Sequence, residues 1–149
     1  MYQSILVPTD GSELANKAVK EAAMLAKSGG ATLVLFHAVR PQFQPVYAEG
    51  VAVPYPPSHS EETRKQMESQ AKRVLAEAAR QVNSNGCTVE QDYAISSRPF
   101  EAIIEAAKEH KCDLIAMASH GYGGFTGLIL GSETQKVLAN SKIPVLVVR

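Results

Sequence analysis

The sequence contains no tryptophan, only two cysteines and no excess of charge of either sign. Fifteen basic residues balance fifteen acidic ones without a long block of one sign, so charge gives no support for a nucleic-acid or membrane-surface partner. Cys87 and Cys112 lie far apart and match no metal-binding or redox spacing, a pattern typical of reduced thiols in a cytoplasmic protein. What remains is a neutral globular chain.

Long hydrophobic runs are missing as well. The longest, "ATLVLFHAV" at residues 31–39, is far too short to cross a bilayer. The first residues show no charged stretch followed by a long apolar segment, so we expect no signal peptide and a cytoplasmic location. Hydrophobic residues nevertheless make up 45% of the 149 positions, enough for one sizeable core. We therefore expect a single domain over residues 1–149.

Short apolar runs alternate with amphipathic segments along the chain. The apolar runs predict strands at residues 4–8, 31–39, 87–95, 113–119 and 143–149. The strand at 87–95 has alternating polarity, which favours a place near a sheet edge. Helical periodicity predicts helices between these strands, at about residues 12–29, 58–84, 97–111 and 132–141.

The helix boundaries have recognisable signals. Ser12 can cap the first helix, and Gly29-Gly30 can end it. Ser58 and Glu61 have capping-box spacing for the second helix, and Pro99 suits the first turn of the third. The apolar face of the first helix is predicted to contain Leu14, Ala18, Ala22 and Leu25. That of the second is predicted to contain Met67, Ala71, Val74, Leu75, Ala78 and Val82.

Proline is concentrated after the second predicted strand. Five of the eight prolines lie between Pro41 and Pro57. Because proline removes backbone donors, we expect an irregular loop at about residues 40–60 rather than another strand.

Five strands alternating with four helices predict an α/β fold. The expected architecture is a doubly wound, Rossmann-like parallel sheet of five strands with helices on both faces. Ligands of such folds bind beyond the carboxyl ends of the strands. The segments "PTDGS", "HAVRP" and the glycine-rich stretch after residue 119 all lie at those ends.

The glycine-rich stretch is followed directly by a predicted helix. The backbone N–H groups and dipole of a helix start favour an anion there, and Ser132 and Thr134 add hydroxyl groups. No Lys or Arg occurs from Cys112 to Gln135, and neither a P-loop nor a GxGxxG fingerprint is present. Bound phosphates would therefore need backbone amides, hydroxyls and a divalent cation.

These motifs resemble those of the universal stress protein family. Its nucleotide-binding members show Gly-x2-Gly-x9-Gly-[Ser/Thr], and here Gly121 is followed by nine residues and then Gly131-Ser132, with Ala118 in place of the first glycine. The "VPTDGS" start, the "SHG" after the fourth strand and the terminal "IPVLVV" are also similar to the family. The resemblance covers the whole chain and implies an adenine-nucleotide-binding domain.

Carried over by position, the resemblance implies a nucleotide site. Pro8, Thr9 and Asp10 would shape its adenine and ribose end, the backbone of Ala38 would bond the adenine, and Met117 and Ala118 would line the nucleoside. Gly121 would approach the ribose and phosphates, and Gly131, Ser132, Glu133 and Thr134 would hold the phosphates. The ligand implied is ATP with Mg²⁺ or Mn²⁺.

Two of these positions depart from the family pattern. The methyl group of Ala118 is harmless at negative φ but obstructive if the ligand touches the backbone there. Glu133 can offer its backbone N–H if the carboxylate points away, whereas a carboxylate turned inwards would repel phosphate.

Other residues have structural alternatives. Asp10 is also typical of a turn before a helix, His37 of a satisfied core histidine, and His120 of a loop-orienting residue. Tyr122 and Phe125 can serve equally as a lid or as loop anchors. Ser132 lacks a His/Asp partner pair, so nucleophilic catalysis is not expected.

The last strand suggests an oligomer. "PVLVVR" at a sheet edge would expose unpaired backbone groups beside aliphatic side chains. Isologous pairing with a second copy would cover them, and the family resemblance also implies a homodimer.

Three functions are compatible with these observations. The first is a cytoplasmic stress-response protein that binds ATP as a regulatory ligand, with at most slow hydrolysis and a protein partner that the sequence does not identify. The second is a dimeric interaction module that binds no nucleotide, and the third is a nucleotide-activating enzyme. The missing phosphate-binding cation argues against the enzyme.

Overall fold

The computed structural model describes residues 1–41, 44–48, 50–55, 61–82, 86–121 and 130–149. Its main sheet has five parallel strands in the order β5-β2-β1-β6-β7. These strands are β1 (Ser4–Pro8), β2 (Thr32–Val39), β5 (Val89–Ile95), β6 (Leu114–Ala118) and β7 (Val145–Val148). Helices α1 (Glu13–Gly29), α2 (Glu61–Gln81), α3 (Pro99–Glu109) and α4 (Ser132–Asn140) connect them. The predicted α/β class and doubly wound parallel sheet are confirmed.

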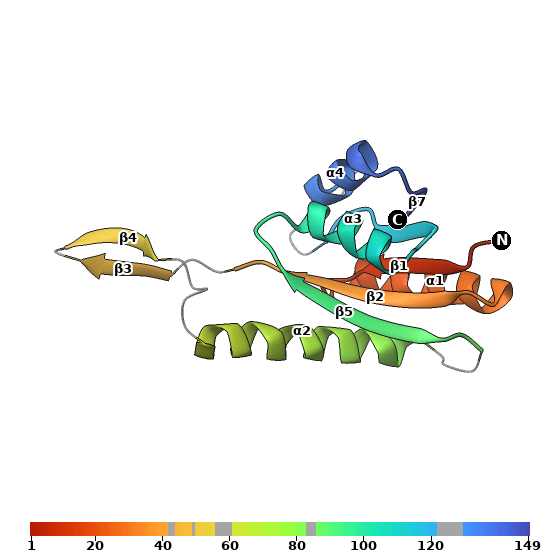
Figure 1. Ribbon diagram of the computed structural model, residues 1–149, viewed down its shortest axis with the longest axis horizontal. Coiled ribbons are helices and arrows are strands. Elements are labelled where there is room, and N and C mark those ends of the chain that lie inside the picture. Colours follow the sequence, from red (N-terminus) through yellow and green to blue (C-terminus); the bar gives the residue numbers. More distant parts are fainter. Residues whose placement is uncertain (42–43, 49, 56–60, 83–85, 122–129) are drawn as a thin grey trace.

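The sheet is covered on both faces, as Figure 1 shows for α2 on one side and α3 and α4 on the other. Alternate residues of the central strands supply the two cores because successive side chains of a strand point to opposite faces. Ile5, Val7 and Leu35 are buried in one cluster with α1 and α2 residues, whereas Leu6 and Phe36 are buried in the other with α3 residues. Strands buried on both sides explain the continuous apolar runs of the sequence.

Helix α1 follows its sequence signals closely. The Ser12 hydroxyl accepts a hydrogen bond from Ala15 N at 3.2 Å, and Gly30 ends the helix in the left-handed region at φ 67°. The predicted face is only partly correct. Leu25 is 41% exposed, and the buried stripe consists of smaller residues: Ala15, Ala18, Val19, Ala22 and Ala26. Packing close to the sheet selects these small side chains over the larger leucine.

The remaining helices agree with their predicted positions. In α2 the buried face contains Met67, Ala71, Leu75 and Ala78, and Val82 is buried just beyond the helix. The predicted Ser58 cap lies outside the described residues. Pro99 opens α3, where its missing N–H needs no partner. After α3 the chain turns into β6 through Lys111, which has a φ of 51°.

The proline-rich segment was expected to be an irregular loop, and this prediction is wrong. Strands β3 (Gln44–Ala48) and β4 (Val51–Tyr55) form an antiparallel pair beyond the carboxyl end of β2 (Figure 1). Pro45 is directly opposite Pro54. Two prolines can face each other where the backbone N–H groups of a pair point away from the partner strand, because no ladder bond is then lost. Gly50, at φ 80°, lies in the connecting turn.

Both edges of the main sheet are now defined. Strand β5 forms one edge, as its alternating polarity predicted, and β7 forms the other. Leu146 in β7 is 37% exposed. None of the described helices is long and apolar enough to cross a membrane.

Candidate functional site

The carboxyl ends of β1, β2 and β6 meet at one edge of the sheet. Thr9 N donates to Phe36 O at 2.8 Å, directly after the last paired residues of β1 and β2, Pro8 and Phe36. The Thr9 carbonyl lies 2.6 Å from Nδ1 of His37, which is 8% exposed. The interpretation of His37 as a satisfied core residue is therefore confirmed, and its contact fixes the chain just before Asp10.

Asp10 lies at the start of the α1 turn. Its Oδ1 accepts a hydrogen bond from Ser12 N at 2.9 Å, so it has the turn role that the Asp-Gly pair suggested. Its Oδ2 occupies the position that a side chain at residue 121 would need. One carboxylate oxygen of Asp10 thus holds the turn before α1, and the other lies against Gly121.

Ala38 and Met117 lie on the same face of the sheet, against the core under α3. The carbonyl of Phe36 points towards β1 and that of Val39 towards β5, where it accepts from Ser96 N at 2.9 Å. Because the direction of backbone groups alternates along a strand, the N–H and C=O of Ala38 point towards β1. The β1–β2 ladder has already ended at that level. A planar polar ligand beyond Pro8 can therefore reach the Ala38 backbone.

Ala118 has a different environment from Met117. Its side chain packs with Ala18 and Val148 on the α1 side of the sheet. The φ of Ala118 is not positive; among the described residues other than glycine, Lys111 is the one with a positive φ. The methyl group of Ala118 therefore causes no backbone strain and points away from the face that contains Ala38.

Thr134 lies deep at the start of α4. Its side chain is 3% exposed, and Oγ1 donates to the Ala118 carbonyl at 2.9 Å. The hydroxyl group is thus directed into the fold and joins α4 to β6. The Thr134 hydroxyl is therefore not available to a phosphate, and only the backbone N–H of Thr134 remains for that role.

Gly131 connects the end of β6 to α4. Its N–H donates to Ser119 O at 2.7 Å, and a Cβ atom at this position would lie 3.1 Å from Cα of His120. Nδ1 of His120 in turn lies 3.1 Å from the Ser119 hydroxyl, in keeping with the structural interpretation of this histidine. Within the described part of the chain, no side chain caps the first turn of α4. Its N–H groups, next to the exposed Ser132, can receive an anion.

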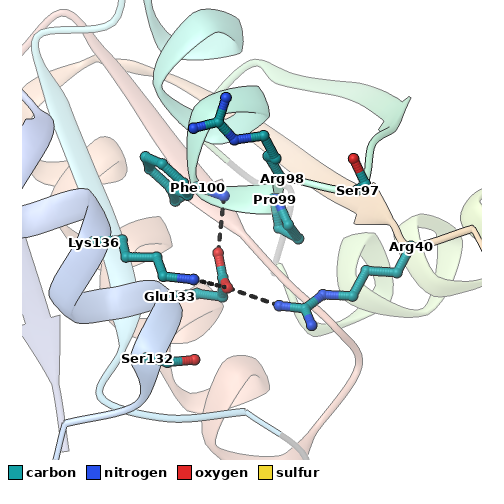
Figure 2. A pocket seen from close by; sticks show the side chains of 8 residues that line it. All are labelled: Arg40, Ser97, Arg98, Pro99, Phe100, Ser132, Glu133 and Lys136. Carbon is teal, nitrogen blue, oxygen red and sulfur yellow. Dashed lines mark hydrogen bonds and ion pairs between the residues drawn. The ribbon is translucent and has the colours of Figure 1, made fainter.

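The carboxylate of Glu133 points towards α3. One oxygen accepts from Phe100 N at 3.0 Å, at the start of α3. The other lies 2.7 Å from Nη2 of Arg40 and 3.3 Å from Nζ of Lys136, as Figure 2 shows. The two orientations considered for Glu133 were a carboxylate pointing away from the expected phosphates and one turned towards them; in the structure the carboxylate is directed to the start of α3. Its backbone N–H therefore stays available at the start of α4.

Arg40 and Lys136 were not among the predicted site residues. Lys and Arg are absent from positions 112–135, and Lys136 lies one position beyond that stretch. Arg40 belongs to the segment "HAVRP", which had already been placed at the carboxyl edge, and that position was the signal that could have found it. Tyr122 and Phe125 lie outside the described residues.

A second polar cluster joins strand β5 to the end of α3. Nε2 of His110 lies 2.9 Å from Oδ2 of Asp92, and Nδ1 lies 3.2 Å from Oε2 of Glu90. The hydrogen bond to Asp92 raises the pKa of His110, with partial burial acting in the opposite direction. No group of three or more His, Cys, Asp or Glu side chains suited to a metal ion occurs among the described residues.

One protein family matches this chain along its whole length. The universal stress protein family matches residues 1–149. A universal stress protein of Thermus aquaticus is 38% identical over 149 residues, with the whole of both chains covered. The solved structure of Methanocaldococcus jannaschii MJ0577 has a TM-score of 0.76 at 28% identity, covering 99% of this chain and 96% of its own.

A further solved structure holds a ligand. It is a universal stress protein in complex with cAMP, with a TM-score of 0.69 and 29% identity, and it covers 99% of this chain and 97% of its own. The match along the entire length, the parallel sheet and the Gly121-x9-Gly131-Ser132 segment agree with one another. This chain belongs to the universal stress protein family.

Proposed function

We propose that this protein is a regulatory protein that binds an adenine nucleotide, ATP with Mg²⁺ or Mn²⁺, at the carboxyl ends of β1, β2 and β6. One observation carries the proposal: a side chain at Gly121 or at Gly131 would collide with another residue of the protein. At Gly121 the obstacle is Asp10, and at Gly131 it is the backbone of His120. Neither glycine has positive φ, so close approach, rather than a special turn, accounts for both.

The described residues fit an adenine nucleotide in three respects. The Ala38 backbone points towards β1 beyond the last paired residue of that strand and can bond the adenine edge. Asp10 lies beside Gly121 at the ribose end. Ser132 and the uncapped first turn of α4 offer donors to phosphates. The similar protein that holds cAMP supports the same ligand class.

The proposed role of the nucleotide is to change which surface the protein offers to a partner. A ligand that binds one conformation more tightly shifts the population towards it. Hydrolysis is expected to be slow because the Ser119–His120 contact joins two neighbouring residues at the end of β6, and no other described residue of the site is arranged as a general base. The alternative function is a dimeric interaction module without a nucleotide, in which the glycines would serve packing alone.

Calorimetric titration of the purified, nucleotide-free protein with ATP and Mg²⁺, and separately with AMP, tests the proposal. We expect saturable binding that Gly131→Ala weakens, since a methyl group 3.1 Å from Cα of His120 must displace the start of α4. Gly29→Ala is the matched control, because its methyl group has its tight contacts with the flexible Met1 side chain and meets the Tyr2 carbonyl oxygen at an ordinary 3.7 Å, outside the proposed site. Absence of binding by folded wild-type protein would contradict the proposal and favour the interaction module.

A further inference from the structure

A pocket of about 480 Å³ lies where the starts of α3 and α4 face the end of β2 (Figure 2). Ser132 lines it, so the pocket adjoins the group of residues to which the phosphates are assigned above. The described residues around it include three basic side chains, Arg40, Arg98 and Lys136, and one acidic side chain, Glu133. The charge balance of the pocket is therefore positive in a protein whose formal net charge is zero.

The pocket already holds an anion that belongs to the chain itself. The Glu133 carboxylate accepts a hydrogen bond from the N–H of Phe100 and forms ion pairs with the guanidinium of Arg40 and the ammonium of Lys136. A helix start and two cations around one carboxylate are the same donors that bind phosphate oxygens in proteins. The pocket thus holds an oxyanion of its own, whose negative charge opposes a second anion and is offset by the positive charges of Arg40 and Lys136.

Arg40 has further N–H donors that can bind a second anion. It contacts Glu133 through Nη2, and its side chain is 61% exposed. A guanidinium carries five N–H donors in a planar fork, so one carboxylate contact leaves others for a phosphate. The contact with Glu133 holds the flexible arginine side chain in place, which reduces the entropy lost when a ligand binds.

Arg98 differs from Arg40 although it lines the same pocket. Figure 2 shows its side chain pointing away from Glu133. Its Nη2 lies 2.6 Å from Oε1 of Glu101, and its guanidinium lies 5.7 Å from the centre of the Phe100 ring. Arg98 therefore contributes long-range charge to the pocket, whereas Arg40 points towards the anion.

We infer that Arg40, positioned by Glu133, binds the terminal phosphates of the nucleotide and makes the site select triphosphates over monophosphates. The inference rests on the proposed function and adds the cation that the stretch from Cys112 to Gln135 lacks. The nucleoside and first phosphate bind at Gly121, Gly131 and Ser132, and only a longer phosphate chain extends into the pocket beside Arg40. Lys136, on the other side of Glu133, adds positive charge at that end.

The experiment compares the ratio of ATP to AMP affinity in three proteins at one concentration of Mg²⁺ and of salt. In Arg40→Gln we expect ATP affinity to fall about tenfold or more, the usual effect of losing a hydrogen bond to a charged group, with AMP affinity unchanged. Arg98→Gln removes the same charge from the same pocket and should leave both affinities within about twofold, since exposed charges act weakly through solvent.

Each result has a distinct meaning. Equal loss of ATP and AMP affinity in Arg40→Gln, no loss at all, or the same ATP loss in Arg98→Gln would overturn the assignment to Arg40 and leave the proposed function standing. Wild-type protein that binds neither nucleotide would overturn the proposed function and the inference together. Thermal unfolding of each variant without nucleotide shows whether it is folded.

Discussion

The carboxylate of Asp10 occupies the space that a side chain at Gly121 would need. One carboxylate oxygen accepts from Ser12 N at 2.9 Å, and the other faces Gly121, so the turn before α1 and the chain after β6 are joined at one point. The glycine and the aspartate therefore depend on each other, although 111 positions of sequence (121 − 10) separate them.

Replacing Gly121 by alanine should disrupt this contact. The added methyl group must displace the Asp10 carboxylate and with it the bond to Ser12 N, so we expect a loss of about 0.5–1.5 kcal/mol in the free energy of unfolding. In an Asp10→Ala background the same substitution should have little effect, because the methyl group then has room. Denaturant unfolding of the single and double variants measures this coupling. Additive effects would show that the two residues do not constrain each other.

The stability contribution of His110 should depend on pH. Contact with Asp92 raises the pKa of His110 above its ordinary value of 6.5, so the folded state binds the proton more tightly than the unfolded chain. The resulting stabilisation is fully present below about pH 6.5 and is lost as the pH rises through the folded-state pKa. Asp92 and Glu90 are partly exposed, which limits the effect to about 0.5–1 kcal/mol.

His110→Gln provides the measurement. The difference in free energy of unfolding between wild type and variant should be largest near pH 5.5 and shrink towards pH 8.5. His37→Gln is not a suitable comparison because His37 is buried against Thr9. A difference that stays constant or grows over this pH range would show that protonation of His110 does not stabilise the fold.

Strand β7 should mediate the proposed homodimer. Pro144 O and Val148 O accept bonds from Ile115 N and Ser119 N of the β6 side, so the backbone groups of Val145 and Val147 point outwards from the sheet. Val147→Pro removes one outward N–H without breaking the ladder to β6. The loss occurs in both copies of a twofold pair, and we expect the dimer dissociation constant to rise about tenfold or more.

Light scattering over a range of micromolar concentrations measures this dissociation, and circular dichroism shows whether the variant keeps its fold. Leu146→Ala serves as a comparison that keeps every backbone N–H. A wild-type protein that is monomeric throughout the range would exclude the β7 dimer.

Substitution of Lys111 by glycine should increase the stability of the protein. Its φ of 51° lies in the left-handed region, which disfavours a residue with a Cβ atom. Relief of that strain exceeds the added flexibility of glycine in the unfolded chain, so Lys111→Gly is expected to stabilise the protein by about 0.5 kcal/mol. Lys108→Gly, in the last turn of α3, should destabilise it by up to about 1 kcal/mol. Thermal unfolding compares the two, and destabilisation by both substitutions would contradict the argument.

Much of the architecture was available from local sequence. Helix α1 begins after its cap Ser12 and ends at Gly30, and helix α3 begins at Pro99. These boundaries could be predicted because caps and first turns depend on a few neighbouring residues. The order of strands and helices predicted the parallel sheet and brought "PTDGS", "HAVRP" and the glycine-rich stretch to one edge. These conclusions required no knowledge of any distant contact.

The failures of sequence reasoning have a common cause. Leu25 has the right spacing for the α1 core face, yet the space between helix and sheet admits only smaller side chains there. Pro45 and Pro54 weaken a strand taken alone, but opposite each other they leave the ladder intact. In both cases the result depends on the facing element, which local propensity does not contain.

The sequence by itself determined the family through its motifs, and the fold class through periodicity, caps and strand order, which are local properties that add along the chain. It also predicted the edge of the sheet at which a ligand would bind. Only the tertiary structure decided that Glu133 turns towards α3, that Arg40 reaches it from the end of β2, and that Asp10 occupies the space beside Gly121. The direction of a charged side chain depends on partners brought near by folding, and no spacing within one segment specifies them.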